Sequence, residues 1–156
     1  MRTVTAEATF AASTADAQAL WCDTGRWVEW VDGLERIVAV DGDWPRAGAT
    51  VTWQSGPAGR GRVTERVLAY GALEGQTVKV ADDSIHGEQA IAFIPDGADV
   101  RVTLALAYAL NRRSPITAVV DLLFIRRAMA TALEHTLERF GVSLKAVAAP
   151  NLDSGR

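Results

Sequence analysis

Glu65 and Arg126 are the two ionisable side chains whose positions suit chemistry in an apolar interior. Glu65 falls in phase with Val63 and Val67 in the segment RVTERVLAY, so alternation along a strand points its carboxyl to the same side as the two valines. Loss of hydration there would raise the pKa of Glu65 toward the range of a general acid or base. A bulge or a shifted register would instead turn Glu65 outward.

Arg126 lies in an apolar stripe of a helix that the sequence predicts near the C-terminus. At about 100° per residue, one side of this helix gathers Val119, Leu122, Met129, Ala130, Leu133, Leu137 and Phe140. Arg126 falls among them, and a guanidinium keeps its proton, so burial requires a carboxylate or water beside it. Arg126 could therefore receive an acidic or carbonyl-bearing ligand. Alternatively, it reaches the rim of the interior or pairs with a carboxylate such as Glu65.

Aromatic side chains supply most of the remaining candidates for ligand contact. Trp27 and Trp30 are three residues apart, so both lie on one face of a short helix. Trp53, Tyr70 and Tyr108 each combine an aromatic ring with a polar edge, which suits a planar or amphipathic ligand. The predicted ligand-binding set is Trp27, Trp30, Trp53, Glu65, Tyr70, Phe93, Tyr108, Arg126 and Met129. Filling of the core is the alternative role for the aromatic members.

Two further polar features are expected to be structural or exposed. His86 and Glu88 resemble an acid–base pair, but both fall out of phase with the apolar residues of their strand, Ile85, Ile91 and Phe93. We therefore expect both to face solvent and Gln89 to face inward. The single cysteine, Cys22, follows two large apolar residues and is expected to pack as a small thiol without a reactive role.

Metal and cofactor chemistry has no motif in this sequence. His86 and His135 are far apart, and no cysteine stands near either at ligand spacing, so no metal site is predicted. No Gly-x-Ser-x-Gly, phosphate loop or dinucleotide fingerprint occurs, so no cofactor is predicted and the enzyme hypothesis is weakened.

Composition and charge restrict the class of protein. A length of 156 residues, nearly half of them apolar, indicates one globular domain. The net charge of −3, with Lys and Arg scattered along the chain, argues against nucleic acid as a partner. The N-terminus alternates apolar and polar residues, unlike a signal peptide, and no stretch is long enough to insert stably in a membrane. We therefore expect a cytoplasmic protein.

Periodicity and turn residues predict the order of the elements. Alternation predicts a strand over residues 2–12, and Ser13 with Asp16 resembles a capping box that starts a short helix. A second short helix carries Trp27 and Trp30 and ends near residue 32. Residues 34–110 then form six strands separated by turns that contain Gly or Pro, which indicates an antiparallel meander. Pro115 opens one long helix that ends at about residue 140, before Gly141.

These elements define an α+β fold class. A sheet of about seven strands with one apolar face needs a cover, and the long C-terminal helix is the only element large enough to supply it. The expected architecture is a curved antiparallel sheet wrapped around that helix, with two short helices after the first strand.

Three segments resemble motifs of a known superfamily: TADAQALWCDTGRWVEWVDGLERI, AGATVTW and GADVRVTLALAY. They are similar to the superfamily that includes birch-pollen-allergen-like proteins, START lipid-transfer domains and the polyketide cyclase/dehydrase and lipid transport family. The resemblance implies a helix-grip fold over residues 1–145. Residues 146–156, which include Pro, Asn, Asp, Ser and Gly, are expected to form a flexible tail. The resemblance also implies an apolar cavity between the sheet and the long helix, with Trp27 and Trp30 near its end as core staples or ligand contacts.

Three functions follow from this resemblance. The first is binding of a small hydrophobic or amphipathic ligand, such as a lipid, an isoprenoid or a polyketide-like compound. The second is a cyclase or dehydratase in which Glu65, Tyr108 or Arg126 assists proton transfer. The third is a protein-interaction module, which would have a filled core. Residues 116–127 are apolar almost all round, which suggests a homodimer contact, a gate to the cavity, a membrane-touching surface or burial under a loop.

Overall fold

The computed structural model describes the backbone of residues 1–111 and 118–148 and the side chains of residues 1–111 and 123–147. The elements, in chain order, are β1 (Arg2–Phe10), α1 (Thr14–Cys22), the 3-10 helix η1 (Thr24–Arg26), α2 (Trp27–Trp30), β2 (Leu34–Asp41), β3 (Thr50–Ser55), β4 (Arg62–Gly71), β5 (Gly75–Ala81), β6 (Ile85–Asp96), β7 (Asp99–Leu110) and α3 (Ala118–Ala148). This order confirms the α+β class and the predicted sequence of strands and helices.

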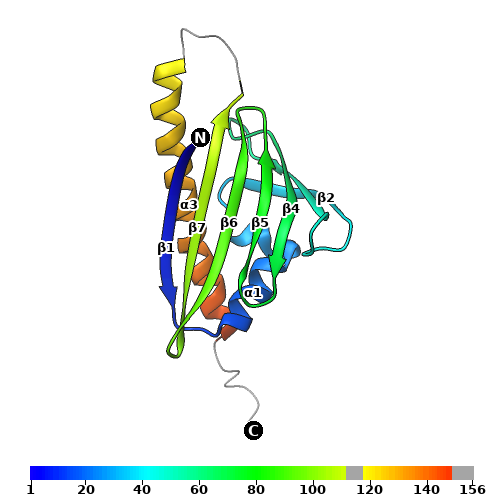
Figure 1. The fold of residues 1–156 in the computed structure, drawn as a ribbon, viewed down its shortest axis with the longest axis vertical. Helices are drawn as coiled ribbons and strands as arrows, with labels where there is room; N and C mark the ends of the chain where they lie inside the picture. The colour runs from blue at the N-terminus through cyan, green and yellow to red at the C-terminus, as the bar shows by residue number, and fades with distance from the viewer. Residues whose placement is uncertain (112–117, 149–156) are drawn as a thin grey trace.

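All seven strands form one antiparallel sheet in the order β1-β7-β6-β5-β4-β3-β2. Strands β2 to β7 are a meander, and β1 adds to the free edge of β7, with Val4 opposite Leu106 (Figure 1). Alternation along β7 buries Val100, Val102, Leu104, Leu106 and Tyr108 on one face. The sheet therefore presents a continuous apolar face, which the long helix α3 and the short helices cover. The helix-grip architecture is confirmed.

The short helices are fixed to α3 by an aromatic cluster of Trp21, Trp30 and Phe140. The ring centroids are 4.7 Å apart for Trp21 and Trp30, 5.6 Å for Trp21 and Phe140, and 5.1 Å for Trp30 and Phe140. Trp27 packs on Trp30 at 6.0 Å, and its Nε1 donates to the main-chain oxygen of Trp21 at 2.8 Å. Such aromatic pairs contribute about 0.5–1.5 kcal/mol each beyond the area they bury. The cluster ties α1, α2 and the C-terminal half of α3 together at one end of the sheet.

The helix α3 runs through Gly141, so the prediction that it ends at about residue 140 is wrong. A Cβ atom added at Gly141 would lie 2.5 Å from Cε1 of Phe10 on β1. The Phe10 ring also packs edge-on against Phe140, with centroids 5.8 Å apart. Glycine at this position therefore marks a close approach of the helix to β1, which outweighs its low helix propensity.

Several sequence expectations fall outside the described residues. The helix continues to Ala148, past the expected domain end at 145, and residues 149–156 of the expected tail are not described. Val119 and Leu122 of the apolar stripe are not described in their side chains. The apolar segment 116–127, which suggested a homodimer, is described in its side chains only from residue 123, where Leu123 and Phe124 are exposed.

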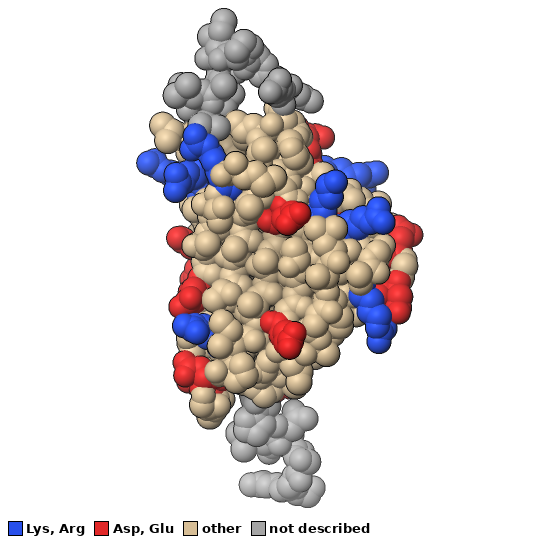
Figure 2. Space-filling view, viewed as in Figure 1, with Lys and Arg blue, Asp and Glu red and all other residues tan. Residues whose placement is uncertain are grey.

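Charged side chains are distributed without a dominant sign on the face of the molecule shown in Figure 2. Acidic and basic residues alternate along its borders, and the area over the central strands is mainly uncharged. The carboxyl group of Glu65, by contrast, is buried in the interior.

The buried Gly87 of β6 gives a direct test of the sheet packing. An added Cβ would meet the main-chain oxygen of Ala107 and would lie 2.7 Å from Cα of Tyr108. Both atoms belong to the backbone of β7, which cannot move without disturbing the strand pairing. Gly87→Ala should therefore lower the free energy of unfolding by about 1–3 kcal/mol, measured by urea denaturation.

Gly56→Ala is the matched control, because a Cβ added at Gly56 meets no atom within 4 Å. Its unfolding free energy should stay within about 0.5 kcal/mol of the parent protein. Equal urea midpoints for Gly87→Ala and the parent protein would contradict the described approach of β6 and β7.

Candidate functional site

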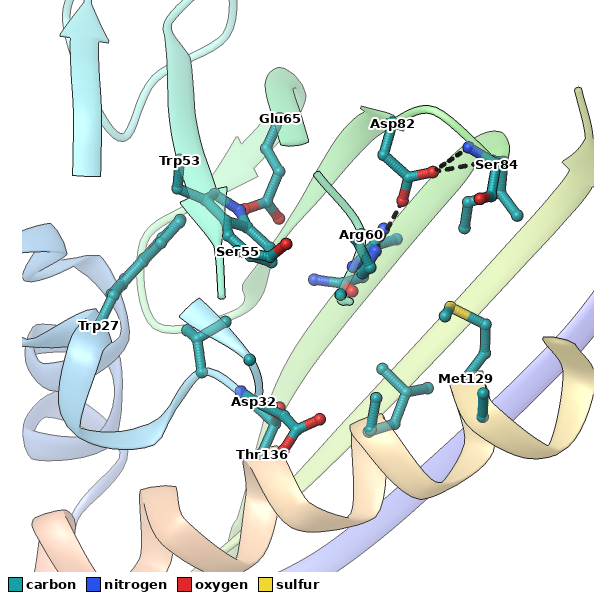
Figure 3. Close-up of a pocket in the computed structure, with 18 of the residues that line it drawn as sticks. Trp27, Asp32, Trp53, Ser55, Arg60, Glu65, Asp82, Ser84, Met129 and Thr136 are labelled. Atoms are coloured by element: carbon teal, nitrogen blue, oxygen red, sulfur yellow. Dashed lines mark hydrogen bonds and ion pairs between the residues drawn. The ribbon is translucent and has the colours of Figure 1, made fainter. Parts of the chain in front are cut away.

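A cavity of about 300 Å³ lies between the apolar face of the sheet and α3 (Figure 3). Its aromatic wall consists of Trp21, Trp27, Trp30 and Trp53, and its aliphatic wall includes Ile85, Leu104, Ile125, Met129 and Leu133. This volume is at the lower end of the range for small-molecule sites. The interior of the fold is therefore hollow, and the side chains around the hollow are predominantly apolar.

The mouth of the cavity is marked by lining residues that also reach the surface. Ala58 and Gly59 in the β3–β4 loop, Ser84 in the β5–β6 loop and Ala128 on α3 are exposed and line the cavity. Gly33, in the loop after α2, is likewise exposed and lines the cavity. The opening therefore lies between two hairpin loops of the sheet, the loop after α2 and the N-terminal half of α3.

Glu65 is the buried carboxyl group of this site. The β4 bulge lies between Val67 and Ala69, beyond Glu65, so the alternation that points Glu65 inward is preserved. Trp53 Nε1 donates to Glu65 Oε2 at 2.8 Å. Burial raises the pKa of Glu65 above its ordinary value, while the Trp53 hydrogen bond and the charge of Arg60 partly offset that rise. The expectation of an inward Glu65 with a raised pKa is met.

Arg60 and Asp82 form an ion pair that joins the two loops at the mouth. Arg60 Nε donates to Asp82 Oδ2 at 2.6 Å, and the Asp82 side chain is only 1% exposed. Asp82 Oδ1 accepts hydrogen bonds from the main-chain nitrogens of Ser84 at 2.7 Å and Ile85 at 2.9 Å. The Arg60 guanidinium lies 5.6 Å from the centroid of the Trp53 ring, within cation–π range. Asp82 is therefore satisfied on both oxygens, and Arg60 connects it to the wall formed by Trp53.

Asp32 and Thr136 are further polar residues in the cavity lining. The Asp32 main-chain nitrogen donates to Thr136 Oγ1 on α3 at 3.0 Å, and the Asp32 carboxylate lies 3.4 Å from Arg139 and 3.7 Å from His135. These contacts attach the loop after α2 to α3 and place the Arg139 guanidinium beside the Asp32 carboxylate.

Five predicted residues line the cavity, namely Trp27, Trp30, Trp53, Glu65 and Met129. Tyr70 lies outside the lining, and its hydroxyl accepts a hydrogen bond from Gln18 Nε2 at 3.0 Å. Phe93 and Tyr108 are buried in the core between sheet and helices, away from the hollow part. These three aromatic residues therefore pack in the core, which was the alternative role. The inward phase of a strand residue does not show whether its side chain meets packed neighbours or a cavity.

Arg126 is exposed and lies outside the cavity lining, so its expected place among the sheet-facing residues is wrong. The covered line of α3 runs through residues four apart: Ile125, Met129, Leu133 and Leu137. Each step of four residues turns this line by about 40° around the helix axis. In the N-terminal half of the helix, the covered line therefore no longer includes the position of Arg126. Straight projection down the helix axis missed this rotation.

Arg60 is the cavity-lining arginine that sequence reasoning missed. It lies between Gly56 and Gly61, a segment interpreted only as a turn. The meander topology could have indicated its position, because the β3–β4 and β5–β6 loops lie at the same end of an antiparallel sheet. This topology predicts that Arg60 in one loop lies close to Asp82 in the other.

The other polar candidates lie as expected. His86 and Glu88 are exposed, while Gln89 lines the cavity. Burial raises the pKa of the Cys22 thiol to about 11, so this thiol stays protonated and unreactive near neutral pH.

Within residues 1–111 and 118–148, no group of three His, Cys, Asp or Glu side chains is arranged to hold a metal ion. No helix among these residues is both long and apolar enough to span a bilayer.

Residues 1–144 match the family described as polyketide cyclase/dehydrase and lipid transport. The chain belongs to this family. No curated protein matches the sequence. Family membership agrees with the resemblance inferred from the motifs, and it accounts for a helix-grip fold that encloses a cavity.

Solved structures show the same fold at low sequence identity. A protein from Thermus thermophilus is 20% identical, with a TM-score of 0.81 over 95% of this chain and 100% of that chain. A START superfamily protein from Mycobacterium smegmatis is 14% identical, with a TM-score of 0.73 over 93% and 98% of the two chains. Norcoclaurine synthase from Thalictrum flavum, in complex with dopamine and hydroxybenzaldehyde, is 12% identical, with a TM-score of 0.70 over 95% and 88%.

The raised pKa of Glu65 predicts a specific pH dependence of stability. The native state keeps the Glu65 proton in a pH range where the unfolded chain has already lost it. The free energy of unfolding should therefore fall as pH rises from about 4.5, by at most about 1.4 kcal/mol per pH unit, until the native carboxyl has ionised. Glu65→Gln should remove this contribution, because its amide oxygen can still accept from Trp53. Urea denaturation from pH 4 to pH 8 measures the difference.

Glu88→Gln provides the control for this pH series, because Glu88 is exposed on the outer face of β6. Its pH profile should follow that of the parent protein. If Glu65→Gln also retained the full pH dependence of the parent protein, a raised pKa of Glu65 would be contradicted.

Proposed function

We propose that this protein binds one small hydrophobic or amphipathic molecule in the cavity between the sheet and α3. The observation that carries the proposal is the hollow itself, about 300 Å³ with walls of tryptophan and aliphatic side chains. Lipid-, isoprenoid- and polyketide-like compounds have the required apolar body. The complex of norcoclaurine synthase with dopamine and hydroxybenzaldehyde supports small aromatic molecules as guests of this fold.

Affinity in such a cavity comes mainly from removal of apolar surface from water. Burial of about 250 Å² of apolar ligand surface contributes roughly 6 kcal/mol at 25 cal/mol per Å², part of which offsets the loss of ligand freedom. Rigid indole rings supply this area with little loss of side-chain entropy. The polar groups at Glu65, Arg60 and Asp32 then orient the ligand rather than provide most of its affinity.

Co-purification of a ligand is the first test. Native mass spectrometry of gently purified protein should show a mass above that of the chain, and extraction with organic solvent should release an apolar compound. A protein that carries no adduct and binds none of a panel of fatty acids and flat aromatic compounds would contradict the proposal.

Filling the cavity should abolish binding. Ala132 on α3 lines the cavity, so Ala132→Phe should lower affinity for the apolar fluorescent probe N-phenyl-1-naphthylamine at least tenfold. Thr131→Phe adds the same side chain at the exposed neighbouring position and should leave affinity unchanged. Probe fluorescence measures both variants, and equal losses of affinity would show that the probe binds outside the cavity.

Catalysis of the cyclase or dehydratase kind is the second candidate function. The observation that favours it is Glu65, an interior carboxyl with a raised pKa that faces a binding cavity. If the protein turns over a bound compound, Glu65→Gln should slow turnover at least a hundredfold while ligand affinity changes little, because the amide cannot transfer a proton. Unchanged turnover would exclude Glu65 as the proton-transfer group.

A third function, as a protein-interaction module, was expected to have a filled core. A cavity of about 300 Å³ does not agree with that expectation. We therefore do not propose this role for the domain.

A further inference from the structure

We propose that the wall formed by Glu65, Arg60 and Trp53 is a subsite for a neutral carbonyl group. The proposal rests on the proposed function and adds the chemical class of the ligand: an apolar molecule that carries a ketone, aldehyde or ester oxygen. The ligand oxygen would accept hydrogen bonds from this wall, beside the mouth of the cavity.

The Arg60 guanidinium has donor capacity that the protein does not use. Its Nε is committed to Asp82, but its Nη2 is buried and has no hydrogen-bond partner among the described residues. A buried N–H group without an acceptor is costly, and a small movement of a side chain at the cavity wall would bring it to a ligand oxygen. Because Arg60 lines the cavity, the acceptor that fits it best is a group on the guest.

Glu65 supplies a second donor at the same wall. Trp53 Nε1 donates to Oε2 of the Glu65 carboxyl, so a proton on the neutral acid resides on Oε1. The carboxyl lines the cavity, and no other hydrogen bond to it is found in the part of the chain that the structure describes. In its neutral form, which burial favours, Glu65 offers an O–H donor to a guest.

Trp53 brings these two donors together. Its indole N–H holds Glu65, and its ring lies 5.6 Å from the Arg60 guanidinium carbon. Figure 3 shows Trp53, Glu65 and Arg60 grouped on one side of the cavity, across from Met129 and Thr136 of α3. Trp30 adds a third donor to the lining, because its buried Nε1 has no hydrogen-bond partner among the described residues. Arg60 Nη2 and Trp30 Nε1 are thus two donors in the lining for which no described residue is the acceptor.

The balance of charge selects a neutral acceptor over an anion. The charges of Arg60 and Asp82 compensate each other in the ion pair, and burial favours the neutral form of Glu65. On the far side, Asp32 faces Arg139 and His135. A carboxylate guest would add an uncompensated negative charge inside an apolar cavity. An ammonium guest would place its own N–H donors against the N–H and O–H donors of the wall, without an acceptor for either. A carbonyl oxygen meets the donors without either penalty.

A set of matched naphthalene probes tests the proposal. Acetylnaphthalene, ethylnaphthalene, naphthoate and naphthylmethylamine, all substituted at the same ring position, share one apolar body and differ in the polar group. Calorimetric titration of the parent protein should show acetylnaphthalene binding at least tenfold more tightly than each of the other three. Carbonyl-labelled acetylnaphthalene should also show a downfield carbon-13 shift on binding, because the carbonyl accepts hydrogen bonds.

The outcomes separate this proposal from the function on which it rests. If no naphthalene binds, and no apolar compound co-purifies, the proposed function itself fails. If all four compounds bind with similar affinity, or naphthoate binds most tightly, the cavity is a binding site but the carbonyl subsite is overturned.

Variants of the ion pair locate the subsite. The double variant Arg60→Met with Asp82→Asn removes the free donor without leaving the buried Asp82 carboxylate unpaired. The ratio of affinities for acetylnaphthalene and ethylnaphthalene should fall to about one, while the affinity for ethylnaphthalene stays within about twofold. Arg62→Met, at an exposed position on β4, should keep the parent ratio.

Arg60→Lys covers the case in which the double variant does not fold. The lysine keeps a positive charge beside Asp82 but lacks the second nitrogen of the guanidinium fork. It should lower the same ratio at least threefold. A folded variant of either kind that kept the full parent ratio and the downfield shift would overturn the assignment of Arg60.

Discussion

The position of α3 depends on the packing of Trp21 and Trp30 against Phe140, and the rest of the interior follows from it. These rings fix the C-terminal half of the helix against the short helices, and Gly141 lets the same part of the helix approach Phe10 on β1. Toward its N-terminal half the helix loses this burial, and Arg126 is exposed. A helix held closely at one end cannot also fill the middle of a wide sheet, so a hollow remains.

This arrangement explains why tryptophan is concentrated in residues 21–30. Small side chains would allow α3 to settle onto the sheet, whereas indole rings keep the helix at a fixed distance and remain rigid as they do so. Trp27 and Trp30 pack in the aromatic cluster region and also line the cavity. The choice between core staple and ligand contact was therefore not a choice between exclusive roles.

Sequence reasoning located the scaffold better than the site, and the reason is physical. Strand alternation has a period of two over a nearly straight element, so Glu65 and Gln89 were oriented correctly from their neighbours. A helix stripe winds around its axis, so the same reasoning misplaced Arg126. Tyr70, Phe93 and Tyr108 resemble the lining residues in their inward phase or in the polar edge of their rings. Whether such a residue borders a cavity, however, depends on the distance between the packed elements around it. No residue pattern encodes that distance directly.

The polar wall is built on different elements from the scaffold that holds the cavity open. Arg60 and Asp82 lie in hairpin loops, and their ion pair satisfies a carboxylate that is almost fully buried. The loops can therefore change their side chains without disturbing the aromatic cluster that sets the position of α3, provided that the charges remain paired. Under the proposed function, the aromatic cluster and α3 would limit the size of a guest, whereas Arg60 in its loop, Glu65 on β4 and Trp53 on β3 would meet its polar group.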